Sequence, residues 1–142
     1  MADLNFFNAF MEALVEGTHD LDTHTFKVYL TNAAPDAAAD SLKTDLAEIS
    51  AGNGYTAGGT ALNVTSSGQT GGTYKLIADD VSFDASGGSI GPFRYAVLYN
   101  DTATGDPLIG WWDYGTAVTL NAGENFVLDF GTDGVLNLAP AA

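Results

Sequence analysis

The sequence predicts an all-β protein, an antiparallel β-sandwich or jelly-roll-like domain with a short N-terminal α-helix. The stretch from Ser89 to Gly115 reads as two strands, because apolar side chains alternate along Phe93–Tyr99 and again along Leu108–Tyr114. Seven to nine short strands of this kind fit along the 142 residues. Glycine-rich turns separate them, which is typical of antiparallel folds.

The first 17 residues have a helical rather than a strand period. They predict a helix over about residues 4–16, capped by Asp3 or Asn5 and stopped by Gly17, because apolar side chains recur at spacings of three and four: Phe7, Phe10, Met11 and Leu14. Two interpretations stay open. The helix either packs on its own sheet or is an arm that docks on a neighbouring subunit. The predicted organisation is therefore residues 1–17 as helix or arm and residues 18–142 as one β-sandwich domain.

The other elements follow from local pattern. Residues 42–49 predict a helical turn or an irregular strand, and residues 66–72 a flexible turn. The glycines of residues 51–60 predict tight turns around an aromatic anchor, Tyr55. The Asp79–Asp80 pair predicts a break or bulge. Strands are predicted at 26–30, 61–64, 73–83, 117–120, 125–130 and 135–138.

The aromatic hairpin of residues 89–115 is apolar on both faces, so both faces must be covered. We expect a second sheet on one face and either a helix or another subunit on the other. Arg94 lies in the middle of its first strand, and a buried unpaired charge costs several kcal/mol. We therefore expect Arg94 to pair with Asp113 or with a neighbour's carboxylate. The predicted interface adds three aromatic side chains of the second strand: Trp111, Trp112 and Tyr114.

The charge balance limits the partners. Four basic residues against eighteen acidic ones give a formal net charge of −14. Nucleic acid and anionic membrane surfaces are disfavoured, because binding to either depends on Lys and Arg. The N-terminal residues have no basic start followed by an apolar run, and no run approaches the roughly 20 apolar residues of a membrane span. We expect the protein to be made and kept soluble in the cytoplasm until it is assembled.

The sequence predicts no catalytic residue, metal or cofactor. Cysteine is absent, and no serine lies in a Gly-x-Ser-x-Gly elbow. His19, Asp20, Asp22 and His24 are metal-ligand types, but their spacing defines no converging site and a plain loop is the better interpretation. Residues 100–106 contain oxygen ligands without the calcium-loop spacing, so a hairpin turn is expected there.

Five segments together resemble a known group of proteins: Lys27–Pro35, Ala47–Gly59, Phe83–Asp101, Pro107–Gly115 and Leu120–Phe130. The residues of these segments and their order along the chain resemble those of small virion structural proteins of tailed bacteriophages. The resemblance implies a non-enzymatic capsid decoration (cement) protein on the outer surface of the head, bridging major capsid subunits. Analogy with other decoration proteins adds a homotrimer at local threefold axes. The alternative is a tail-tip or fibre component that binds host-surface glycan through Trp111, Trp112 and residues 100–106.

Overall fold

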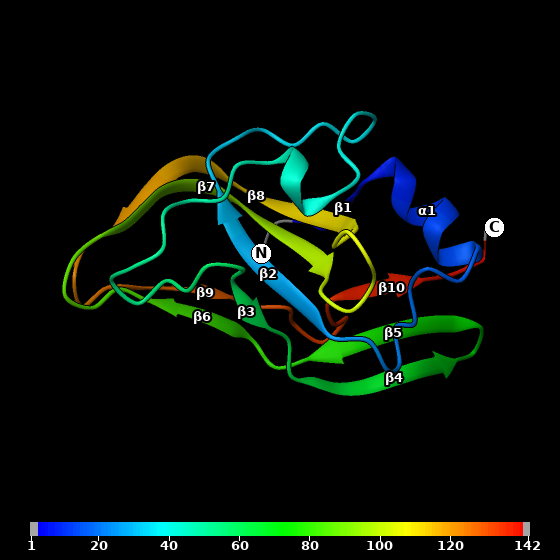
Figure 1. Cartoon of the computed structure of the whole chain (residues 1–142). Coiled ribbons are helices and arrows are strands. Elements are labelled where there is room, and N and C mark those ends of the chain that lie inside the picture. The colour runs from blue at the N-terminus through cyan, green and yellow to red at the C-terminus, as the bar shows by residue number, and fades with distance from the viewer. Residues whose placement is uncertain (1–2, 141–142) are drawn as a thin grey trace.

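A computed structural model describes residues 3–140, which form two layers of antiparallel strands (Figure 1). The all-β prediction is confirmed. The first layer is a five-stranded sheet, in spatial order β1 (Asn5–Phe6), β8 (Leu108–Leu120), β7 (Ile90–Asn100), β2 (Phe26–Thr31) and β3 (Thr60–Ala61). The second layer contains β10 (Leu136–Leu138), β5 (Thr73–Ala78) and β4 (Val64–Thr70), beside the separate pair β6 (Val81–Asp84) and β9 (Asn125–Leu128).

The main hydrophobic core fills the space between these layers. Alternation along the strands directs one set of side chains inward, and both layers contribute. Val28, Leu98 and Trp112 come from the five-stranded sheet, and Leu76 and Leu128 come from the second layer. Trp112 is 5% exposed, so this predicted interface residue is a core residue in the folded chain.

A smaller core lies on the other face of the five-stranded sheet. Tyr29, Val97 and Tyr99 are buried there against Leu46, which belongs to the segment 32–58 that crosses this face. That segment carries the 3₁₀ helix Lys43–Asp45, seen above the sheet in Figure 1. Cover for the second face of the aromatic hairpin is therefore supplied by segment 32–58 of the same chain.

Polar contacts hold segment 32–58 in place. The Tyr55 hydroxyl donates to the Glu48 carboxylate at 2.6 Å and accepts the Leu30 N–H at 3.0 Å. Lys43 pairs with Glu48 at 2.9 Å and lies over the Tyr29 ring, 4.8 Å from its centroid. Tyr55 is 3% exposed, so the predicted aromatic anchor is confirmed.

The helix α1 (Asn8–Val15) is shorter than predicted. Asn5 and Phe6 form β1 instead and pair with Trp111 and Gly110 of β8. The predicted caps Asp3 and Asn5 are wrong, because the residue before the helix is Phe7, which has no polar group to cap with. A backbone that pairs with a sheet edge satisfies its N–H groups there, which outweighs the helical pattern of residues 4–7.

One side chain anchors α1 to its own domain. Phe10 is fully buried and stacks on Phe6 of β1, with ring centroids 5.3 Å apart and planes 10° apart. Met11 and Val15 face away from the core, and Val15 is 85% exposed. Of the two interpretations of the N-terminal segment, the structure describes the helix that packs on its own sheet.

Two strands run further than predicted. β4 includes Ser66–Thr70, which were expected to be a flexible turn, and the turn is at Gly71 and Gly72, both with positive φ. β8 continues past Gly115 to Leu120, with an irregularity in its pairing to β7 between Asp113 and Val118. The break at Asp79–Asp80 is confirmed, since these two residues separate β5 from β6.

Candidate interaction surface

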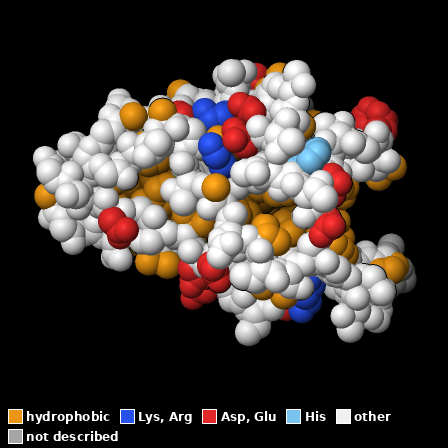
Figure 2. All heavy atoms as spheres, turned by 60° about the horizontal axis from the view of Figure 1, so that its bottom comes forward, with side chains coloured by type: hydrophobic (Ala, Val, Ile, Leu, Met, Phe, Trp, Pro, Cys, Tyr) orange, Lys and Arg blue, Asp and Glu red, His pale blue; other side chains and the backbone are white. Residues whose placement is uncertain are grey.

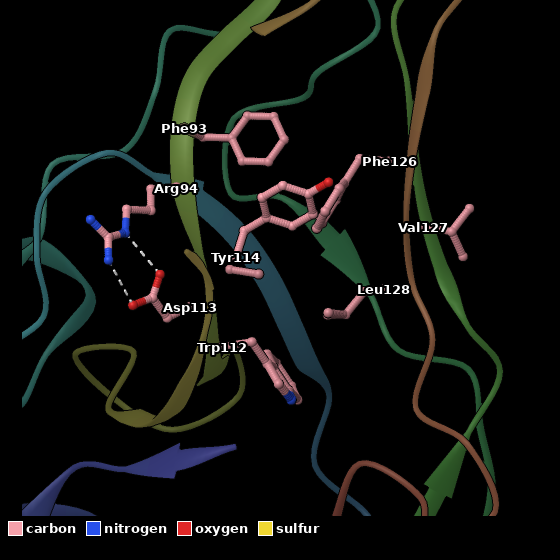
Figure 3. A pocket seen from close by; sticks show the side chains of 9 residues that line it. Phe93, Arg94, Trp112, Asp113, Tyr114, Phe126, Val127 and Leu128 are labelled. Atoms are coloured by element: carbon pink, nitrogen blue, oxygen red, sulfur yellow. Dashed lines mark hydrogen bonds and ion pairs between the residues drawn. The ribbon is translucent and has the colours of Figure 1, made fainter. Parts of the chain in front are cut away.

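An apolar groove of about 220 Å³ lies between β7 and β8 on one side and β9 on the other. Figure 3 shows the side chains of Phe93, Trp112, Tyr114, Phe126 and Leu128 pointing toward one another across it. Phe126 is central to the groove. Its ring is edge-on to Phe93 at 5.2 Å and to Tyr114 at 5.5 Å between centroids. The volume is sufficient for one ring-sized apolar group, because an apolar cavity of about 150 Å³ holds benzene.

A bulge in β8 exposes one wall of this groove. Tyr95 pairs with Asp113 whereas Phe93 pairs with Val118, so β8 takes five residue steps where β7 takes two. Gly115 lies within the bulge at φ +97°, a conformation that L side chains rarely adopt. As a result Tyr114 is 55% exposed at the mouth of the groove.

Val127 provides the second exposed apolar side chain here and is 47% exposed. It lies between the inward-facing Phe126 and Leu128 on β9, and Figure 3 shows it pointing away from the groove. Tyr114 and Val127 are thus exposed on either side of Phe126. We call these two residues together with the groove the Tyr114 surface.

Arg94 and Asp113 form the expected ion pair within the hairpin. Two parallel bonds join them, from Arg94 Nε to Asp113 Oδ1 at 2.8 Å and from Nη2 to Oδ2 at 3.1 Å. These bonds lower the pKa of Asp113, and the Gly115 N–H adds to the effect by donating to the same carboxylate at 2.8 Å. Figure 3 places the pair on the other side of the β7–β8 strands from the groove interior. Arg94 and Asp113 therefore neutralise each other at the edge of the groove lining.

All four cationic side chains of the sequence are paired in this way. Besides Arg94, Lys27 pairs with Asp101, Lys43 with Glu48 and Lys75 with Asp133. On the face shown in Figure 2, the blue Lys and Arg side chains lie beside red Asp and Glu side chains. Eighteen acidic residues less these four partners leave fourteen carboxylates outside the pairs. The protein as a whole therefore carries a net negative charge.

The eight predicted interface residues do not form one surface. Phe7, Phe10 and Trp112 are buried inside the chain. Trp111 packs its ring on Phe7, 4.7 Å between centroids, on the opposite sheet face from Trp112. The groove lining brings together only Arg94, Trp112 and Tyr114, while Met11 and Leu14 lie apart on α1.

Sequence reasoning missed the β9 wall of the groove. The alternation of Phe126 and Leu128 with Val127 identifies a strand and its two faces. It does not say which strand lies opposite. Phe126 of β9 contacts Tyr114 of β8, about a dozen positions earlier, because the fold brings the two strands together. The signal available was an apolar residue, Val127, at the position that alternation assigns to solvent.

Metal-ligating residue types do not gather in the part of the chain that the structure covers. Across residues 3–140, no three His, Asp or Glu side chains are placed to hold a metal ion. His19 and His24 do converge, but on the Asn100 side chain. The loop at Asn100–Asp106 is a hairpin turn, in which the side-chain Oδ1 of Asn100 accepts the N–H groups of Thr102 and Ala103.

Within the same residues, no helix has the length and apolar character that a membrane crossing would require. Comparison with protein-family models, curated proteins and solved structures finds no match to this chain.

Proposed function

We propose that this chain is a non-enzymatic virion structural protein of a tailed bacteriophage. In this proposal it is a capsid decoration protein that binds the outer head surface and bridges neighbouring major capsid subunits. The virion part of the proposal rests on the resemblance of the five segments between Lys27 and Phe130. The binding part rests on one observation, the exposed Tyr114 surface on a domain whose other aromatic side chains are largely covered by its own chain.

The Tyr114 surface has the composition of an interface centre. Tyrosine is enriched at such centres, and a groove beside it can take a partner's apolar side chain as an anchor. The groove is already formed, and its walls are strands and not loops, so little ordering accompanies binding. A decoration protein acts through binding energy repeated at many symmetric positions, where modest contacts add together.

The charge indicates the kind of partner. With each Lys and Arg paired to a carboxylate, the surface offers no strong attraction to packaged DNA, which supports a position on the outside of the shell. The complementary partner is a capsid loop that places an apolar side chain in the groove and Lys or Arg around it. Each copy has a net charge of −14, so a homotrimer requires apolar contacts that outweigh repulsion between copies.

The test uses heads from particles that lack this protein and adds purified variants back. The double variant Tyr114→Ser and Val127→Ser removes both exposed apolar groups of the Tyr114 surface. We expect it to bind at least about 30-fold more weakly, the equivalent of one interface hot spot of about 2 kcal/mol. The matched control is Leu42→Ser, another exposed apolar residue, in segment 32–58. Equal binding by both variants would remove the Tyr114 surface from the proposal.

Two further parts of the proposal have separate tests. Met11→Ser tests the outer face of α1 in the same add-back assay, and weaker binding would extend the interface to that helix. The mass of the purified protein by native mass spectrometry tests the homotrimer. If the protein is a monomer at concentrations above those of the add-back assay, the homotrimer is wrong, and the proposal becomes decoration by single copies.

The glycan-binding alternative has less support. Its proposed surface combined Trp111, Trp112 and residues 100–106, but the two tryptophans lie on opposite faces of the sheet. Trp112 is buried, and the Asn100 side chain is engaged by two histidines. Saturable binding of the purified protein to host polysaccharide would restore this alternative.

A further inference from the structure

The loop that follows α1 is joined to the turn after β7 by two histidines that share one amide. Asn100, the last residue of β7, is fully buried. Its Nδ2 lies 3.0 Å from His19 Nδ1 and 2.9 Å from His24 Nδ1. These contacts join positions about 80 residues apart in the sequence.

The backbone fixes the orientation of the Asn100 amide. Its Oδ1 accepts the Thr102 N–H at 2.9 Å and the Ala103 N–H at 3.1 Å. A flipped amide would direct its NH₂ group at these two donors. The NH₂ group must therefore face the histidines, and it has one hydrogen for each.

Both histidines must then be neutral, because each Nδ1 has to accept a hydrogen bond. His24 Nδ1 accepts a second donor, the Asp20 N–H, at 3.3 Å. A proton on Nδ1 would place two donors against each other and remove the contact with Asn100. The two hydrogen bonds donated by Asn100 therefore require both imidazoles to be neutral.

The two rings differ in what surrounds them. His19 is 5% exposed, and its Nε2 has no hydrogen-bond partner among the described residues 3–140. From α1 the Phe10 ring faces it at 5.3 Å between centroids, and the hollow beside it is lined by Leu14, Tyr74 and Ser67. The charged groups nearby are on its own loop, where Asp20 and Asp22 also line that hollow and the Asp20 carboxylate accepts the N–H groups of Asp22 and Thr23.

Charges from the remaining elements do not favour a proton on His19. Asp101 of the β7–β8 turn is paired with Lys27 of β2. A charge on His24 would attract the Asp20 carboxylate and repel a charge on His19. Burial, followed by this repulsion, lowers the pKa of His19 to about 4.

We propose that His19, kept neutral by Asn100, is an acid-sensitive latch whose protonation releases α1 and the loop of residues 17–25 from the sandwich. The released elements include Phe10, which packs on the His19 ring, so acidification uncovers an aromatic patch. This proposal does not depend on the proposed function, because it concerns a different part of the molecule.

The experiment measures hydrogen-exchange protection of individual amides by NMR at pH 7.5 and pH 4.5. If released His19 titrates at its ordinary value of 6.5, opening becomes about 70-fold more favourable at pH 4.5 than at pH 7.5. We expect protection in residues 8–25 to fall by about that factor, while β2 and β7 keep theirs. The proposal would be overturned if the protection of residues 8–25 relative to β2 and β7 were the same at both pH values. An equal fall of protection in every strand would overturn it as well.

Two variants separate the latch from general acid sensitivity. His19→Asn retains an acceptor in the position of Nδ1 but takes up no proton, so the fall in protection of residues 8–25 should be much smaller than in the wild type. The contact between His24 and Asn100 remains in this variant and accounts for any residual fall. Asn100→Asp replaces the donor by a carboxylate that accepts both from the turn and from protonated rings. It should reverse the pH dependence, and the same fall as in the wild type would contradict the proposal.

Discussion

Replacement of Phe10 by alanine tests directly whether α1 belongs to its own domain. The ring is fully buried in the main core and is stacked on Phe6. Removal of a buried phenylalanine side chain costs about 3–5 kcal/mol, which includes the cavity left behind. Since the Phe10 site lies beneath a helix of only eight residues, which can settle partly into the space, we expect about 3–4 kcal/mol.

The assay is urea denaturation followed by tryptophan fluorescence, because Trp112 in the core reports on global unfolding. The matched control is Val15→Ala on the same helix, where the side chain is 85% exposed. We expect this control to change the free energy of unfolding by less than about 0.5 kcal/mol. A loss below about 1 kcal/mol for Phe10→Ala would refute the packing of α1 and favour an arm that docks on another subunit.

Two further predictions concern segment 32–58 and its surroundings. Tyr55→Phe removes a buried hydroxyl that donates to Glu48, so we expect the free energy of unfolding in urea denaturation to fall by about 2 kcal/mol. A fall below about 0.5 kcal/mol, which is about the error of the method, would contradict this role of the hydroxyl. Gly59 has φ +81°, and a Cβ there would collide with the Val28 carbonyl, so Gly59→Ala should cost at least about 2 kcal/mol. Gly68→Ala is its control, because φ is not positive there and the space is open; similar losses for the two would show that backbone conformation is not the cause.

The sequence predicted best what depends on neighbouring residues. The alternation in Phe93–Tyr99 identified β7, and a hairpin brings its two strands together in a narrow set of registers. Asp113 on the returning strand was one of two expected partners for Arg94, beside a neighbour's carboxylate, and the structure shows the pair with Asp113. The break at Asp79–Asp80 was also local, because two adjacent carboxylates fit poorly in a buried strand.

Long-range pairing explains the parts that were wrong. Residues 66–70 have no apolar periodicity, yet β5 supplies a partner and they form a strand. Asn5 and Phe6 follow a helical pattern, but they form a strand because they pair with the edge of β8. The sequence did not identify segment 32–58 as the cover of the second sheet face. This segment is held by single contacts, such as Tyr55 to Glu48, which leave no periodic pattern in the sequence.

The candidate site was only partly predictable for the same reason. Tyr114 was identified as an interface residue from its place in the aromatic hairpin, and the structure finds it exposed. Trp112 carries the same pattern but is buried by Phe130 of a distant segment, their ring centroids 5.6 Å apart. Exposure and burial of neighbouring aromatic residues depend on the opposite layer, which alternation along one strand does not identify.

The most direct test of the proposed function locates the protein in the particle. Virions produced by the genome that encodes this chain would be separated into heads and tails, and the protein would be quantified in each fraction against the major capsid protein. The proposal predicts many copies on heads, in a fixed ratio to capsid subunits, and release or weakening when Tyr114 and Val127 are replaced. A few copies confined to tails, or none in the particle, would contradict it.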